Sequence, residues 1–315
     1  MTTAEPQQAR EALDAFREDR TYLGADHRRN ERRTWIVTGI CAVTLVAQVA
    51  GGLAFRSMAL TASGLHMAAH VAALLVAAGA YALARRHAEN PRFAFGTGKL
   101  GYLAGFANAV VLAMTALLIA VESVQRLLAP EAVDYVSAFP IAAAGLAITL
   151  VCMWLLRPTG GQSHRHDREG DLNLTAAHLH LTADAIVSML ALIAMLAGMY
   201  LGWAVFDPLA GLVGAALVGH FAWTLLKRAG LSLLDVNPSA ELTAEIRGRL
   251  EADGERVIDL HLWRLGPGHH AAIAVVTDDH PKPVEAYRAR LAGLPGLSHV
   301  TIEVRGAGAE HGHRH

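Results

Sequence analysis

Two pairs of ionisable residues interrupt long apolar stretches of the 315-residue sequence. His66 and His70 form the first pair, and His180 and Asp184 form the second. The two residues of each pair are spaced i, i+4, so on a helix both side chains lie on one face, about one turn apart. An ionisable group within a membrane helix costs free energy, about 2.5–3.5 kcal/mol for an aspartate at the helix centre, so such groups usually mark a functional site. The spacing predicts that three imidazoles and one carboxylate converge between two helices.

This donor set is typical of a tetrahedral transition-metal site, with zinc, cobalt and nickel as candidate ions. Calcium and magnesium prefer a larger number of oxygen ligands and fit the set poorly. Histidine has an unperturbed pKa of about 6.5, so protons compete with a metal for it near neutral pH. The alternative is that the four groups only form hydrogen bonds between helices and stabilise the bundle.

The elements that must position these residues are membrane-spanning helices. The sequence is 53% hydrophobic and only 17% charged, whereas soluble chains contain about 25% charged residues. A helix that crosses a bilayer needs about 20 predominantly apolar residues. Six runs reach or nearly reach this length: Thr34–Phe55, Ser57–Ala84, Leu103–Val121, Tyr135–Leu156, Leu172–Phe206 and Pro208–Leu226. The net charge of −1 provides no basic excess, so no nucleic-acid partner is expected.

Basic residues are unevenly distributed among the connections between these spans. They gather before span 1, between spans 2 and 3, between spans 4 and 5, and after span 6. Because positively charged connections favour the cytoplasmic side, we expect both termini in the cytoplasm and the chain in the plasma (inner) membrane.

From residue 237 onward the composition is that of a soluble domain. Segments with helical or strand-like spacing follow in the order Ser239–Ala252, Val257–Leu265, Ala271–Thr277, Pro283–Leu294 and Val300–Val304. This αββαβ order predicts a small ferredoxin-like α+β domain. The expected divisions are a cytoplasmic N-terminal segment (1–33), a six-helix all-α transmembrane domain (34–236), a cytoplasmic C-terminal domain (237–305) and a histidine-rich tail (306–315).

Several short motifs resemble those of the cation diffusion facilitators, a family of proton-coupled exporters of divalent metals. The matching stretches are Ser57–Leu60 before His66 and His70, Arg92–Lys99, His180 with Asp184, Asp207–Gly211, Leu233–Asp235 and His261–Trp263. The resemblance extends from about Thr34 to Val304 and covers most of the chain. It implies a homodimer that transports metal through a site formed by His66, His70, His180 and Asp184.

One departure from the family pattern concerns the choice of metal. Many members have aspartate where this sequence has His70, and a further aspartate at the position of Ser63. A histidine pair on span 2 resembles the branch associated with cobalt and nickel efflux (DmeF-type). Co²⁺, Ni²⁺ and Zn²⁺ are therefore all candidate substrates, and no cofactor is expected beyond the transported metal and protons.

The resemblance also bears on features outside the transport site. Phe93 and Thr97 occupy positions at which some relatives have metal-binding histidines, so that site is expected to be missing. Lys99 and Asp235 resemble the partners of a charge interlock between spans 3 and 6.

Other histidines among the 17 are weaker candidate ligands. His164 and His166, in the connection before span 5, either capture metal loosely or are ordinary solvated residues. In the C-terminal domain, His261, His269 and His270 either contribute to a second metal site or are ordinary surface residues. Gln48 and Asn108 are expected to form interhelical hydrogen bonds, and His220 is expected to be a packed histidine without a ligand role.

Two other functions compete with efflux. A metal-binding sensor or scaffold would use the same ligands without moving ions. An intramembrane metalloenzyme would share the spacing of His66 and His70, but Met67 stands where zinc proteases have a catalytic glutamate, so we expect no enzyme. Cys41 and Cys152 lie within apolar runs and are expected to pack as small hydrophobic residues rather than as ligands.

Overall fold

The computed structural model describes residues 22–23, 26–54, 58–129, 135–157, 171–203 and 205–306. Within these ranges, the side chains of residues 52, 58–63, 65 and 66 are outside the description. The chain divides into two compact units. One contains residues 24–85 and 99–234, and the other contains residues 1–23, 86–98 and 235–315.

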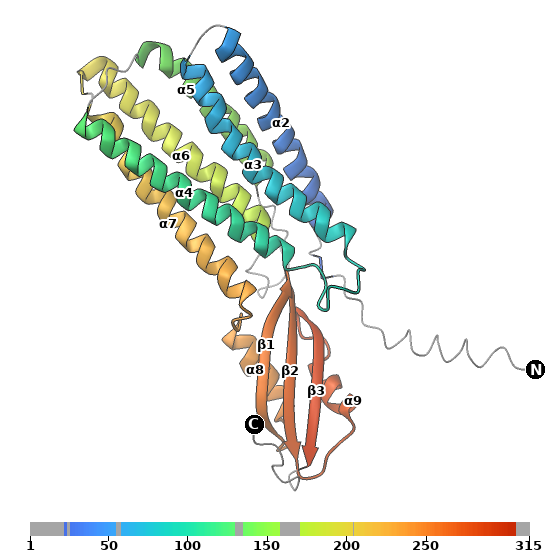
Figure 1. Cartoon of the computed structure of the whole chain (residues 1–315). Helices are drawn as coiled ribbons and strands as arrows, with labels where there is room; N and C mark the ends of the chain where they lie inside the picture. Colours follow the sequence, from blue (N-terminus) through green and yellow to red (C-terminus); the bar gives the residue numbers. More distant parts are fainter. Residues whose placement is uncertain are drawn as a thin grey trace, which may run out of the picture. The chain divides into compact units, whose positions relative to one another are not determined.

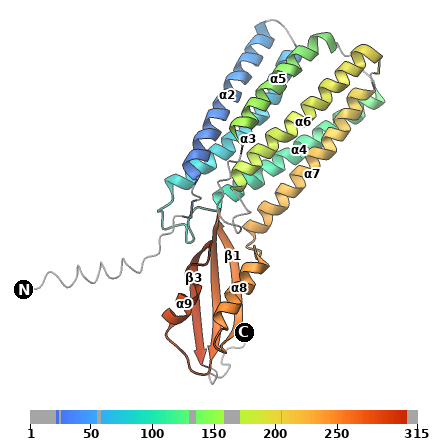
Figure 2. The ribbon, with the colours of Figure 1, turned by 180° about the vertical axis from the view of Figure 1, so that it is seen from behind.

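The first unit is a bundle of long helices (Figures 1 and 2). Its members are α2 (His27–Ala54), α3 (Met58–Arg86), α4 (Leu100–Leu128), α5 (Tyr135–Leu155), α6 (Leu172–Leu201) and α7 (Phe206–Leu233). By length and composition, all six of these helices could cross a membrane. This confirms the six spans that were predicted from the apolar runs.

The ends of the helices differ from the ends of the apolar runs. Helix α4 continues seven residues past Val121, through Glu122 and Arg126 to Leu128, because backbone hydrogen bonding does not stop where charged side chains begin. Helix α6 ends at Leu201, before the predicted limit of Phe206, and Gly202 follows in the left-handed conformation with a φ of 69°. Glycine adopts this conformation without steric cost and commonly terminates helices.

Many large apolar side chains of the bundle are exposed. Val43, Leu118 and Trp223 are each more than 60% exposed, although they lie within long helices. In a soluble protein such surfaces would favour aggregation, whereas in a bilayer they face lipid.

The helices that carry the predicted ligands, α3 and α6, both contribute side chains to the buried part of the bundle. Helix α6 packs against α4, α5 and α7. A buried apolar cluster contains residues of α2, α3, α5 and α6, among them Val37, Leu74, Leu156 and Leu181.

The second unit contains a small α+β domain, as predicted. Its elements are α8 (Ala240–Leu250), β1 (Arg256–Gly266), β2 (His269–Asp278), α9 (Val284–Leu291) and β3 (Leu297–Gly306). The strands have the order β1-β2-β3, with β1 antiparallel to β2 and β2 parallel to β3. The αββαβ order is therefore confirmed.

Local sequence explains where the elements of this domain begin and turn. The Ser239 side chain accepts a hydrogen bond from the backbone N–H of Leu242 and caps α8. Gly268, with a φ of 75°, lies in the turn between β1 and β2. Ile246, Leu262, Ala274 and Tyr287 belong to one buried cluster, so both helices pack on the same face of the sheet.

Candidate metal centre

The predicted ligands lie on α3 and α6, and three of their side chains are described. His70 is 4% exposed and His180 is 5% exposed, and the Asp184 side chain is 9% exposed. The backbone of His66 lies in α3, one turn before His70, but its side chain lies outside the description.

His70 lies between the other two side chains and contacts both. Its Nδ1 atom is 2.9 Å from Nε2 of His180, and its Nε2 atom is 3.3 Å from Oδ1 of Asp184. The two imidazole rings are nearly perpendicular, at an interplanar angle of 80°. The three groups thus form a continuous polar chain that links α3 to α6 in the interior of the bundle.

The contacts of this chain require protons. A hydrogen bond between two ring nitrogens forms only when one of them carries the hydrogen. The distances are satisfied when His180 donates from Nε2 to His70, and His70 donates from its own Nε2 to Asp184. In this arrangement each imidazole is neutral and carries one hydrogen, and both nitrogens of His70 are engaged in hydrogen bonds instead of with a metal.

A hydroxyl group from a third helix also contacts the aspartate. The Thr149 Oγ1–H of α5 donates to Oδ2 of Asp184 over 3.0 Å. Thr149 is 4% exposed. Thr149 was not predicted from the sequence, because a single hydroxyl group in an apolar run has no periodic partner.

The described ligands do not surround a common point. No group of three or more His, Cys, Asp or Glu side chains in the described part of the chain is arranged to hold an ion as it stands. The geometry explains this, because both nitrogens of His70 are directed at its two neighbours. A metal that binds all three groups requires the His70 ring to turn away from this chain of hydrogen bonds.

A polar cluster at one end of the bundle fixes the relative positions of the two ligand-bearing helices. Asp171 caps α6 by accepting hydrogen bonds from the backbone N–H groups of Asn173 and Leu174. The same carboxylate accepts from the Tyr81 hydroxyl of α3 and from Asn30 of α2. Asn173 in turn donates to the backbone carbonyl of Ala77 over 2.9 Å. These bonds set the register of α3 against α6, and with it the distance between His70 and His180.

Asn108 does not form the hydrogen bond that the sequence predicted. Its side chain on α4 is 1% exposed. Among the described residues, neither of its amide atoms has a hydrogen-bond partner. Within the described part of the chain, the predicted interhelical hydrogen bond of Asn108 is therefore not formed.

The candidate histidines of the C-terminal domain do not converge. His261 is 2.8 Å from Oδ2 of Asp259, and both side chains are more than half exposed. His269 contacts the Ser298 hydroxyl at 2.7 Å, and His270 contacts the backbone carbonyl of Gly296 at 3.3 Å. His261 is opposite Ile273 in the sheet, several positions along β2 from the other two histidines. A shared metal site of these three residues remains an untested prediction.

The other candidates cannot be compared with a described geometry. His164, His166 and the tail from residue 307 lie outside the described residues. Lys99 precedes α4 and Asp235 follows α7, and they belong to different units of the chain. The proposed charge interlock therefore stays a prediction.

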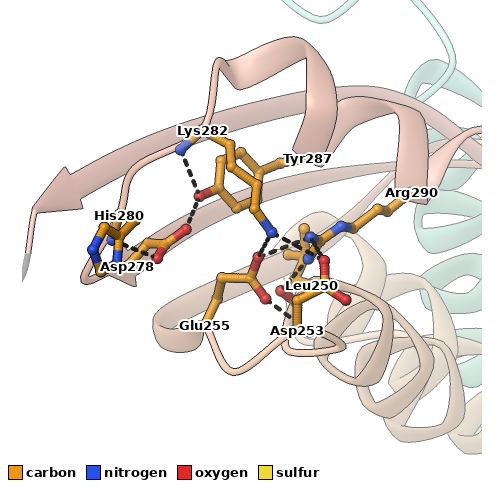
Figure 3. A network of polar contacts seen from close by, with 8 residues as sticks. All are labelled: Leu250, Asp253, Glu255, Asp278, His280, Lys282, Tyr287 and Arg290. Atoms are coloured by element: carbon orange, nitrogen blue, oxygen red, sulfur yellow. Dashed lines mark hydrogen bonds and ion pairs between the residues drawn. The ribbon is translucent and has the colours of Figure 1, made fainter.

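A second buried carboxylate, Glu255, lies in the C-terminal domain (Figure 3). Its side chain is 1% exposed, and Oε1 contacts Arg290 at 2.8 Å and Lys282 at 2.9 Å. The hydrogen bond from Arg290, with a further one from Lys282, holds the pKa of Glu255 well below its usual value. Nearby, the Tyr287 hydroxyl donates to Asp278 over 2.6 Å and lowers the pKa of that carboxyl group.

Comparison with known proteins places the bundle in a family. The cation efflux transmembrane domain matches residues 34–234. Zinc transporter ZitB of Pectobacterium atrosepticum is 32% identical over 282 residues, which cover 87% of this chain and 85% of that protein. Metal cation efflux system protein CzcD of Cupriavidus metallidurans is 30% identical, with 89% and 90% covered. A cadmium, cobalt and zinc/H(+)-K(+) antiporter of Bacillus velezensis is 28% identical, with 85% and 86% covered.

The match includes every helix of the bundle and both predicted ligand pairs. The prediction that the chain is not an enzyme agrees with this assignment. The chain is an integral membrane protein with six spans, and it belongs to the cation efflux family of transporters.

Proposed function

We propose that this protein exports divalent transition-metal cations from the cytoplasm in exchange for protons. The observation that carries the proposal is the buried chain from His180 through His70 to Asp184, which joins two membrane helices. His66 lies one turn from His70 on the same helix and supplies the fourth ligand. Three imidazoles and one carboxylate complete a tetrahedral donor set.

Proton coupling follows from the chemistry of the ligands. A metal binds the lone pairs of neutral imidazole and ionised carboxylate. Each imidazole must therefore turn a lone pair toward the ion, and any ligand that carries an extra proton must lose it before the ion binds. When protons arrive from the other side of the membrane, they add to the imidazole and carboxylate lone pairs and displace the metal. The same atoms therefore bind either the ion or the protons, and this competition is the basis of antiport.

The substrate class rests on the relatives and on the ligand types. The names of the relatives include zinc, cadmium and cobalt, and nitrogen-rich coordination suits zinc, cobalt and nickel. We propose zinc as a substrate, and cobalt and nickel as ions that the histidine pair of α3 favours. His70→Asp tests this preference, since it replaces a nitrogen donor with an oxygen donor and so makes the donor set chemically harder.

The orientation and the assembly are part of the same proposal. The basic connections support a cytoplasmic location of both termini and of the C-terminal domain. We further propose that the protein acts as a homodimer in the inner membrane, as its resemblance to the family implies.

The test is transport into sealed vesicles that contain the purified full-length chain. Zinc, cobalt and nickel are supplied separately, with and without a pH gradient, and the accumulated metal is measured. We expect accumulation that depends on the gradient and is lost in His70→Ala. The matched control is His220→Ala, which removes a histidine of α7 outside the proposed site; this side chain is exposed and not packed as predicted.

The outcome also separates transport from sensing. A sensor or scaffold would bind zinc with the same residues but would not accumulate it in vesicles under any gradient. Equal transport by His70→Ala and the wild type would show that the site is wrongly assigned.

A further inference from the structure

The only two cysteines of the sequence meet in the interior of the bundle. Cys41 of α2 and Cys152 of α5 are 111 positions apart in the chain, and their Sγ atoms are 3.8 Å apart. Cys41 is 2% exposed and Cys152 is 0% exposed, and both are free thiols. The efflux mechanism proposed above uses neither of them.

We propose that Cys41 and Cys152 form a separate binding site for a soft divalent cation such as Cd²⁺. Thiolate sulfur selects soft ions, whereas harder ions prefer oxygen donors. Two sulfurs bound to one tetrahedral zinc ion at about 2.3 Å are about 3.8 Å apart, and a larger soft ion such as Cd²⁺ needs a slightly greater separation. The observed separation is therefore close to what an ion that bridges the pair requires.

The surroundings favour a bound species without net charge. The cysteines belong to a buried hydrophobic cluster that includes Val37, Leu156 and Leu181, and Cys41 also interacts electrostatically with the Asp184 carboxylate. An isolated charge would be costly there. Binding breaks two S–H bonds and releases two protons, so two thiolates and one divalent cation leave the site neutral. Met67 lies in the same cluster and offers a thioether as a further soft donor.

The pair lies beside the His/Asp site, not within it. Cys152 follows Thr149 by three residues on α5, which is about 4.5 Å along the helix axis. Thr149 holds Asp184, so a cation on the cysteines would join α2 to the helix that supports the aspartate. The predicted packing of both cysteines among apolar residues is confirmed, and the proposal adds a second role to it.

The experiment is cadmium titration of the purified full-length chain, kept reduced with a phosphine and embedded in lipid nanodiscs. Cadmium thiolates absorb in the ultraviolet by charge transfer, whereas imidazole and carboxylate complexes do not produce this band. X-ray absorption at the cadmium edge counts sulfur neighbours directly. We expect the wild type to show the band and cadmium–sulfur distances.

The variants separate this site from the proposed transport site. Cys41→Ser and Cys152→Ser should each lose at least half of the band, and the cysteine-free Cys41→Ala/Cys152→Ala protein should lose it entirely. His70→Ala should retain the full band, because its change lies in the His/Asp site. Failure of the transport assignment would instead appear as normal vesicle efflux by His70→Ala.

One result on the wild type alone overturns the proposal, whatever the variants do. If cadmium binds the reduced protein with nitrogen and oxygen neighbours only, or does not bind, then the cysteines are not a cation site. Size-exclusion chromatography and circular dichroism of each variant show whether a lost band reflects lost ligands or lost fold.

Discussion

Asp184 and Glu255 are both buried carboxylates, but their partners differ in kind. Glu255, in the C-terminal domain, contacts an arginine and a lysine, whose positive charges are permanent at neutral pH. The described partners of Asp184, in the membrane bundle, are a histidine and a threonine hydroxyl. A histidine gains and loses its charge near neutral pH, whereas an arginine does not.

The difference in partners distinguishes a carboxylate whose charge is permanently compensated from one whose partners can change their own charge. The cations around Glu255 compensate its charge at all times, so the network holds the α8–β1 turn against α9 (Figure 3). Around Asp184, under the proposed function, a metal ion takes the place of the hydrogen bonds with histidines. Burial alone therefore does not distinguish a carboxylate of the fold from a proposed ligand, and we use the type of partner instead.

The largest effect is expected for Asp184→Asn. The amide keeps the size of the carboxylate but cannot supply its charge to a bound cation. We expect zinc accumulation in vesicles to fall at least about a hundredfold, because a charged ligand contributes about 3 kcal/mol or more to such a site. The variant should still elute as a folded protein, and residual transport near the wild-type level would contradict the role assigned to Asp184.

The two carboxylates should also respond differently to acid. Metal affinity of the His/Asp site should fall by about tenfold per pH unit for each proton that binding displaces, and isothermal titration of zinc measures it. The Glu255 network should be unaffected near neutral pH, where histidine titrates. Because the folded-state pKa of Glu255 is lowered, its contribution to stability is complete above its unfolded value of about 4.3 and is lost as the pH falls further.

Loss of the charge at Glu255 should destabilise the C-terminal domain and leave metal binding by the bundle unchanged. In Glu255→Gln, Lys282 and Arg290 lose a shared anion that is 1% exposed. We expect the C-terminal domain to lose about 1–3 kcal/mol of stability, measured by hydrogen exchange of the β1 and β2 amides in the full-length chain. Zinc affinity of the bundle should stay at the wild-type level, and a parallel loss would show that the two carboxylates are coupled.

The smallest effect is expected for Thr149→Val. This change removes one hydrogen bond to Asp184 and keeps the shape of the side chain, so zinc affinity should change by about fivefold, equivalent to about 1 kcal/mol. Thr115→Val is the matched control, because that exposed hydroxyl donates only to the Val111 carbonyl in its own helix. Equal effects of the two changes would mean that the Thr149 hydroxyl does not position Asp184.

Much of the fold could be predicted because its signals are local. Each span is an apolar run longer than the bilayer requires, and each predicted element of the C-terminal domain carries its own periodicity. The helix ends were less accurate, as α6 shows, because a single residue such as Gly202 can stop a helix within an apolar run. The contacts of Glu255 were not predicted, since they join segments that are 27 and 35 positions apart.

The sequence by itself determined which residues share a helix face: His66 with His70, and His180 with Asp184. Helical periodicity is a property of the local chain and needs no knowledge of its neighbours. Only the tertiary structure decided that His70 lies between His180 and Asp184, that Thr149 holds the aspartate, and that Cys41 meets Cys152. These contacts depend on how separate helices pack and rotate against one another, and packing is decided by the whole bundle at once.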